Sequence, residues 1–94
     1  MKFFANAYTK SGIPDILCCC NGYFLGVEVK APNGKPSELQ KRNIRLINEE
    51  GGFGVILYPD QLDDFRTLIF YLRYREDPDE AREAVLKINE RWDK

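Results

Sequence analysis

The first third of the chain contains two acids and one lysine whose types and spacing suit metal and phosphate chemistry: Asp15, Glu28 and Lys30. Between the acids, Asn21-Gly22 separates two apolar runs and predicts a two-residue hairpin turn, because both positions tolerate positive φ. Counting outward from this turn places Asp15 directly opposite Glu28. Lys30 shares their face because side chains alternate along a strand. We therefore expect three ionisable groups to converge at one end of a hairpin.

Opposed carboxylates repel one another, so such a pair either shares a proton or binds a cation. An Asp and a Glu with open positions suit Mg²⁺ or Mn²⁺, which take one or two carboxylates together with waters and phosphate oxygens. The alternative is a solvated ion cluster, the usual fate of surface acids and lysines. Two features favour a site. Both strands look apolar on both faces, so the sheet should be covered, and the loop after Lys30 contains Pro and Gly, which leave room for a ligand.

Gln40 is the fourth candidate, on the apolar side of a predicted helix and one turn from its start. It can form a capping box with Ser37, or it can point at the site or at a DNA phosphate, and the spacing does not decide between these readings. Lys41, Arg42 and Arg45 follow on the same helix. They form either a solvated face or contacts to a nucleic-acid backbone.

The elements that position these residues follow from the apolar pattern. Strands are predicted over residues 2–8, 15–20, 23–30 and 53–58, a loop over 31–36, and helices over 37–50, 60–74 and 77–92, with Asp60 and Asp77 as caps. The first helix is long enough to join two parallel strands. The expected fold is a single α/β domain over residues 1–94, with a core of 1–74, a mixed sheet and C-terminal helices. The uncharged face of the hairpin should be a core surface: Pro14, Ile16, Cys18, Cys20, Tyr23, Leu25, Val27, Val29.

The predicted helix over residues 60–74 is apolar nearly all round, including Phe65, Phe70, Tyr71 and Tyr74. One flank can cover the sheet, and the rest would leave a larger apolar patch than monomers usually expose. A homodimer is therefore expected. The alternative is cover within the chain by the final helix, whose apolar stripe consists of Ala81, Ala84, Val85, Ile88 and Trp92.

Charge and composition narrow the classes of protein. The net charge is −1, which counts against a strongly basic nucleic-acid binder. Residues 1–58 carry seven Lys/Arg against five Asp/Glu, and residues 59–94 carry seven against ten, so a phosphate-facing surface is expected in the first part. No apolar run of about 18 residues is present, which excludes a membrane span. The start lacks the layout of a secretion signal, so we expect an intracellular, cytoplasmic protein.

The three cysteines are consecutive, Cys18, Cys19 and Cys20. Neighbours in a strand point to opposite faces, and the chain has no His, so these residues cannot form a four-ligand zinc site. Their odd number argues against a disulfide framework. We expect small buried apolar residues in a reducing compartment rather than redox groups.

Several of these features together resemble a known family. Gly12-Ile13-Pro14-Asp15, then Glu28-Val29-Lys30, then Gln40 ten residues later are similar to the motif of the PD-(D/E)xK nuclease superfamily. Lys30-Ala31-Pro32, the Gly-Lys-Pro-Ser-Glu-Leu-Gln stretch over 34–40, and Gly51-Gly52 before a strand resemble more narrowly the virus-type replication–repair nuclease (VRR-NUC) domain in its short form. The similarity covers about residues 3–70.

The resemblance implies a restriction-endonuclease-like fold and metal-dependent, structure-specific cleavage of DNA, including branched junctions, by a homodimer. Asp15, Glu28 and the Val29 carbonyl would hold Mg²⁺ or Mn²⁺. Lys30 would position or activate the attacking water, and Gln40 would be the motif residue on the helix. Candidate contacts to nucleic acid are Lys10, Ser11, Lys35 and Lys41. The location would be the cytoplasm, of the host cell if the protein is viral.

One departure from the family leaves other functions open. The family usually has a helix before the first strand that carries a further Glu ligand, and no acidic residue precedes Asp15 in this sequence. A catalytically inactive nuclease fold that binds nucleic acid or protein is therefore an alternative. A second alternative is an interaction protein whose wide apolar helix is its functional part.

Overall fold

The Asn21-Gly22 turn closes the predicted hairpin, with φ values of 54° and 86° at its two residues. The structure is a computed structural model that describes residues 13–93. In it, β1 (Ile16–Cys20) pairs antiparallel with β2 (Tyr23–Val29). Cys20 lies opposite Tyr23, so the predicted register is confirmed. The strand expected over residues 2–8 lies outside the described residues.

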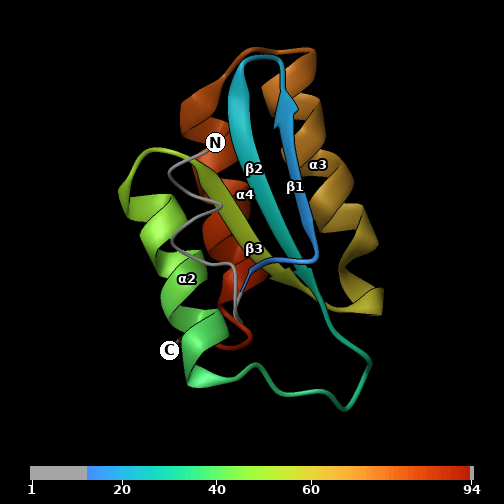
Figure 1. Ribbon diagram of the computed structural model, residues 1–94. Helices are drawn as coiled ribbons and strands as arrows, with labels where there is room; N and C mark the ends of the chain where they lie inside the picture. The colour runs from blue at the N-terminus through green and yellow to red at the C-terminus, as the bar shows by residue number, and fades with distance from the viewer. Residues whose placement is uncertain (1–12, 94) are drawn as a thin grey trace.

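The chain then crosses over one face of the sheet to a parallel strand (Figure 1). The remaining elements are α2 (Glu38–Glu49), β3 (Phe53–Leu57), η1 (Pro59–Gln61), α3 (Leu62–Arg73) and α4 (Pro78–Asn89). The described strands lie in the order β1-β2-β3, with β2 and β3 parallel, so the mixed sheet and the α/β class are confirmed. None of the helices in residues 13–93 has the length and apolar character needed to span a lipid bilayer.

The sheet has two covered faces and two core clusters. Alternate residues of β2 and β3 point to α3 and α4, and the core they form consists of Leu25, Val27, Phe53, Val55, Leu57, Leu68, Leu72, Ala81, Val85 and Ile88. The other face packs against α2 through Ile44, Ile47, Ile56 and Tyr58. Burial of each large side chain of this kind stabilises the fold by about 1.5–3 kcal/mol.

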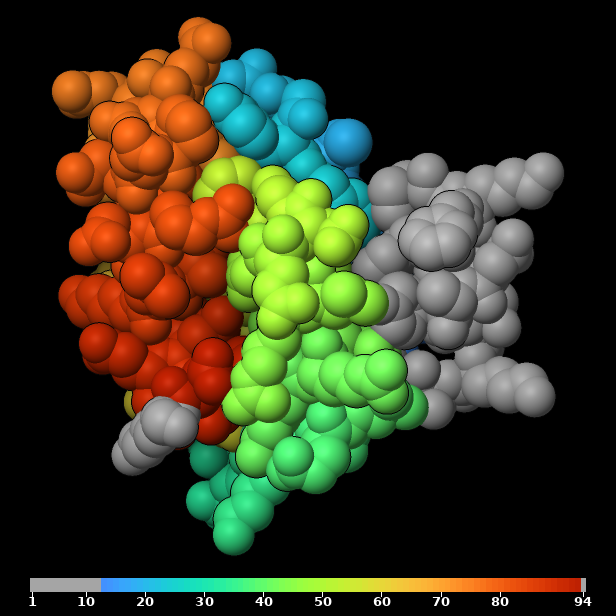
Figure 2. Space-filling view, turned by 90° about the vertical axis from the view of Figure 1, so that its left-hand side faces the viewer, coloured from blue at the N-terminus to red at the C-terminus, as the bar shows by residue number. Residues whose placement is uncertain are grey.

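α4 covers much of α3 within the same chain. Ala81, Val85 and Ile88 of the predicted stripe are buried, whereas Trp92 lies beyond the end of α4 and packs against the other cluster. Figure 2 shows α4 beside the turn from α2 into β3. On that side Arg82 donates a hydrogen bond to the Gly52 carbonyl (2.7 Å). The intramolecular cover that the sequence left open is therefore present.

Two asparagine side chains close the outer edge of β3. Asn48 of α2 exchanges two hydrogen bonds with the Gly54 backbone, at 2.8 and 3.0 Å. Asn89 of α4 accepts from the Ile56 amide (3.2 Å) and donates to the Gly54 carbonyl (3.0 Å). Side-chain amides thus satisfy backbone groups that a further strand would otherwise pair with.

Glycines let α2 lie close to the sheet. A Cβ atom at Gly54 would stand 3.1 Å from the Ile44 carbonyl oxygen, and one at Gly26 would stand 2.8 Å from the terminal Cδ1 of Ile47. Both glycines are buried, on neighbouring strands and on the face that α2 covers. This close approach sets the distance from the sheet to every side chain that α2 directs toward it.

The prediction of buried cysteines is wrong. Cys18 and Cys19 are exposed and Cys20 is half-buried. Ile16 and Val29, expected on the core face, are also each 48% exposed. The helices cover the middle of β2 and all of β3, whereas β1 lies at the edge of the described sheet.

The prediction of Asp60 as a helix cap is also wrong. Asp60 lies inside the short η1 turn, and its side chain forms an ion pair with Arg91. Gln61 is the residue that precedes α3, and its side chain accepts a hydrogen bond from the Tyr58 amide (3.0 Å). Pro59 starts the extra turn and shifts the beginning of α3 to Leu62. Asp77 caps α4 as predicted, through the Glu80 amide.

The close packing of α2 gives a prediction for two matched substitutions. Gly54→Ala should destabilise the fold by about 1–3 kcal/mol, because the added methyl meets the backbone of α2. Gly26→Ala should cost less, because the atom it meets is the mobile end of Ile47. Urea unfolding of both variants measures the difference. A larger loss for Gly26→Ala would contradict this account of the packing.

Candidate active site

Glu28 is the buried acid of the described fold, with 4% of its surface exposed. It lies near the carboxyl end of β2, on the face that α2 covers. Its Oε2 atom accepts a hydrogen bond from Gln40 Nε2 (3.0 Å) and lies 3.7 Å from Lys30 Nζ. The lysine side chain is itself only 17% exposed. Three of the four predicted site residues are therefore brought together around one carboxylate.

Gln40 does both things that the sequence analysis left open. Its Oε1 accepts from the Ser37 amide (2.9 Å), and its own amide donates to Ser37 Oγ (3.1 Å), which is a complete capping box. Because Oε1 is engaged by this N–H, the side-chain NH₂ group faces Glu28. The cap at the start of α2 thus fixes the orientation of the group that holds the carboxylate.

Asp15 reaches the same end of β2 by another route. It lies just before β1 and is exposed, and its Oδ2 atom accepts a hydrogen bond from the Val29 amide (2.9 Å). The carboxylate therefore continues the pairing between the two chain segments beyond the last paired residues, Ile16 and Val27.

The surroundings raise the pKa of Glu28 above its ordinary value of 4.5. The largest cause is burial, and the second is the negative charge of Asp15. The charge of Lys30 and hydrogen bonds from Lys30 and from the Asp15 backbone act in the opposite direction without cancelling the effect. A cation beside these two acids would act against the shift, because it would favour the ionised form of Glu28.

The donor set fits a divalent ion that keeps several of its waters. Asp15 and Glu28 supply two carboxylates, as Mg²⁺ and Mn²⁺ sites commonly have. The Val29 amide points at Asp15, and in a strand the N–H and C=O of one residue point to the same side, which directs the Val29 carbonyl there too. Within residues 13–93 there is no group of three or more His, Cys, Asp or Glu side chains placed to hold a metal.

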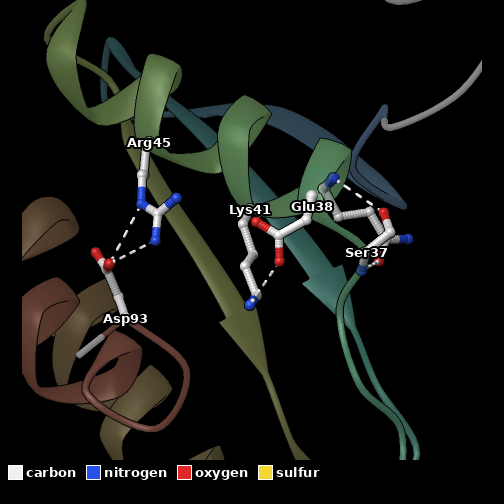
Figure 3. A network of polar contacts seen from close by, with 6 residues as sticks. Ser37, Glu38, Lys41, Arg45 and Asp93 are labelled. Carbon is white, nitrogen blue, oxygen red and sulfur yellow. Dashed lines mark hydrogen bonds and ion pairs between the residues drawn. The ribbon is translucent and has the colours of Figure 1, made fainter.

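The predicted nucleic-acid contacts lie in different surroundings. Lys35 is exposed in the loop between β2 and α2. Lys41 forms an ion pair with Glu38 (3.1 Å), and Arg45 is held by Asp93 (2.8 Å) (Figure 3). Such surface pairs contribute only about 0–1 kcal/mol, so a phosphate can replace the acid as the partner of the lysine. Lys10 and Ser11 lie outside the described residues.

A tyrosine that the sequence pattern did not indicate anchors the loop after Lys30. Tyr58, 6% exposed at the end of β3, donates its hydroxyl hydrogen to the Gly34 carbonyl (2.7 Å). A buried tyrosine needs an acceptor for its O–H, so a tyrosine at the end of a predicted buried strand indicates that such an acceptor lies nearby. That partner is distant in sequence and could not be identified from the pattern. The bond fixes the loop that carries Lys35.

The raised pKa of Glu28 predicts how stability depends on pH in the metal-free protein. Ionisation of Glu28 disfavours the folded state. The protonated side chain therefore contributes stability at low pH, and this contribution is lost as pH rises from about 4.5 through the raised pKa. Glu28→Gln should therefore be more stable than the parent at neutral pH, and the difference should shrink toward pH 4. Urea unfolding in chelator across this range measures it, with Glu49→Gln on the exposed face of α2 as control. A parent that is more stable at pH 7 than Glu28→Gln would refute the argument.

Comparisons with protein-family models, with curated proteins and with solved structures found no match to this chain.

Proposed function

We propose that the chain is a metal-dependent endonuclease that hydrolyses phosphodiester bonds in DNA, with branched or junction DNA as the favoured substrate. The observation that carries the proposal is the buried Glu28, held by Gln40 and Lys30 and close to Asp15. A buried carboxylate with a raised pKa beside a second acid is typical of a functional site. A surface ion cluster would not need a helix cap to orient one of its members.

Each residue has a role that its contacts support. Asp15 and Glu28 would hold the ion, together with the Val29 carbonyl. A divalent ion bound there would supply Lewis-acid polarisation of the phosphate and a water of lowered pKa. Lys30 would donate hydrogen bonds to a phosphate oxygen and to the attacking water from its position beside Glu28. Gln40 is a positioning residue, because it touches Glu28 and is itself held by Ser37.

The fold supports the same proposal. A hairpin that carries the acids, followed by a crossover helix and a parallel strand, is the arrangement expected of a restriction-endonuclease-like domain. Membership of the VRR-NUC family is part of the proposal and rests on the residues around Asp15, Glu28-Val29-Lys30 and Gln40.

A second candidate function is a catalytically inactive nuclease fold that binds nucleic acid or protein. The observation in its favour is the two-carboxylate donor set among the described residues. The two candidates differ in one measurement. An inactive fold binds branched DNA without metal-dependent cleavage.

Cleavage should require a divalent metal and both carboxylates. With Mg²⁺ or Mn²⁺, the protein should cut one or more of a panel of single-stranded, duplex, nicked, forked and four-way-junction DNAs. Asp15→Ala and Glu28→Ala should each reduce the rate by about 10²- to 10³-fold. Glu49→Ala, which removes an exposed acid elsewhere on α2, is the matched control. Full activity in excess chelator, or in Glu28→Ala, would end the proposal.

Lys30→Ala should separate metal binding from cleavage. The variant should lose cleavage but bind Mn²⁺ at least as tightly as the parent, because one positive charge next to the carboxylates is removed. Calorimetric titration with Mn²⁺ measures binding without any turnover. A Lys30→Ala variant with full activity would assign this lysine to ion pairing alone.

The homodimer remains a prediction. It now rests on the family resemblance, because α4 covers one flank of α3 and leaves few exposed apolar residues there, with Leu62, Phe70 and the following Tyr74 the largest. Sedimentation at micromolar concentration and moderate salt should give twice the chain mass of 10.9 kDa. A species of the chain mass alone would refute the dimer.

A further inference from the structure

An aromatic and arginine cluster lies at the carboxyl end of α3, away from the carboxylate site. Phe70 and Tyr74 are 44% and 67% exposed, and their ring centroids are 6.1 Å apart. The Arg75 guanidinium lies 6.0 Å from the Phe70 ring centroid, and that of Arg73 lies 5.6 Å from the Tyr74 ring centroid. We call these four residues the α3 platform: two rings on the surface, each with a cation beside it.

The platform is positive in an otherwise acidic half of the chain. Its four residues include two arginines and no acid, whereas residues 59–94 as a whole have more acids than bases, four of them directly after Arg75: Glu76, Asp77, Asp79 and Glu80. Within the described residues, neither Arg73 nor Arg75 forms an ion pair with a carboxylate. Two cations without an acidic partner are available to an external anion.

The platform is held in place by hydrogen bonds at the end of its helix. The Phe70 carbonyl accepts from the amides of Tyr74 (2.9 Å) and Arg75 (3.2 Å). The Asp77 amide donates to the Tyr71 carbonyl (2.9 Å), across Glu76 at a φ of 48°. Asn21 of the hairpin turn donates to the Leu72 carbonyl (3.0 Å). The backbone that carries the rings and cations is therefore fixed before a ligand binds.

We propose that the α3 platform binds single-stranded nucleic acid. Unpaired bases stack on Phe70 and Tyr74, and Arg73 and Arg75 contact the phosphates on either side. Exposed rings interleaved with cations are the combination that binds single strands without sequence preference. A duplex keeps its bases stacked on one another and offers the rings no free base face. A protein partner or a second copy would require the unpaired arginines to be desolvated or matched by acids.

The platform and the carboxylate site lie at opposite ends of the sheet (Figure 1). The seven residues of β2 between them span roughly 20 Å. A branched DNA has unpaired or readily unpaired bases close to its duplex arms. The platform could thus hold a single strand while the other end of the molecule contacts duplex. Binding at the platform does not depend on whether Glu28 supports cleavage.

The test measures binding of a fluorescently labelled twelve-nucleotide oligo(dT) to the full chain in the presence of chelator. Fluorescence anisotropy reports the affinity at several salt concentrations. Phe70→Ala/Tyr74→Ala should weaken binding at least tenfold with an unchanged salt dependence. Arg73→Ala/Arg75→Ala should weaken binding and lower the slope of log K against log salt by about 1.4, the value for two phosphates of a single strand. Leu86→Ala and Lys87→Ala on α4 are matched controls for an exposed apolar residue and an exposed cation.

Unchanged affinity in both double variants, or equal losses in the controls, would overturn the proposal. So would a ring variant that binds oligo(dT) normally but loses a dimer in sedimentation, because the rings would then be an interface between copies. A platform that binds anionic vesicles but not oligo(dT) would also overturn it. The arginine variant keeps the test valid if the ring variant unfolds. Cleavage by Glu28 is measured separately, so failure of the platform and failure of the proposed nuclease give different results.

Discussion

The close packing of α2 on a glycine-lined sheet is the constraint on which the rest of the structure depends. Gly26 and Gly54 remove the side chains that would hold the helix away, and α2 then reaches the backbone of β3 at Asn48 and the carboxylate of Glu28 at Gln40. A larger separation would break both contacts together. It would leave a buried acid without its amide donor and an open backbone edge on β3.

The surroundings of Glu28 oppose its ionisation more than they favour it. Burial of Glu28 disfavours its ionised form, Asp15 adds to the cost, and one lysine offsets only part of it. A protein selected for stability alone would replace Glu28 by an apolar or neutral residue. In this fold, Gln40 and Lys30 instead surround an ionisable side chain. Residues that work against stability in this way are expected at functional sites.

Much of the fold follows from the sequence because its signals are local. The Asn21-Gly22 turn determined the hairpin register, and the strands and helices begin and end within a few residues of their predicted limits. The position of Lys30 beside Glu28 also followed from the alternation of side chains along a strand.

What the sequence did not predict depends on contacts between distant segments. The exposure of Cys18 and Cys19 reflects which strand the helices leave at the edge, and an apolar pattern cannot specify that. The hydrogen bond from Tyr58 to Gly34 and the α3 platform could not be predicted either, because both depend on how loops and helix ends are placed in three dimensions. The two readings of Gln40 could not be separated from spacing because both place its side chain at the same point, and both are present.

The asparagine closure of β3 limits where the sheet can be extended. Asn48 and Asn89 occupy the backbone groups of Gly54 and Ile56 from two helices. A strand from another molecule would have to displace both amides before it could pair there. Sequence insertions that lengthen the sheet, and designed fusions that add a strand to it, are therefore incompatible with the β3 side. The same amides act as a barrier to edge-to-edge fibre formation along β3, because a fibre needs two open edges on every copy.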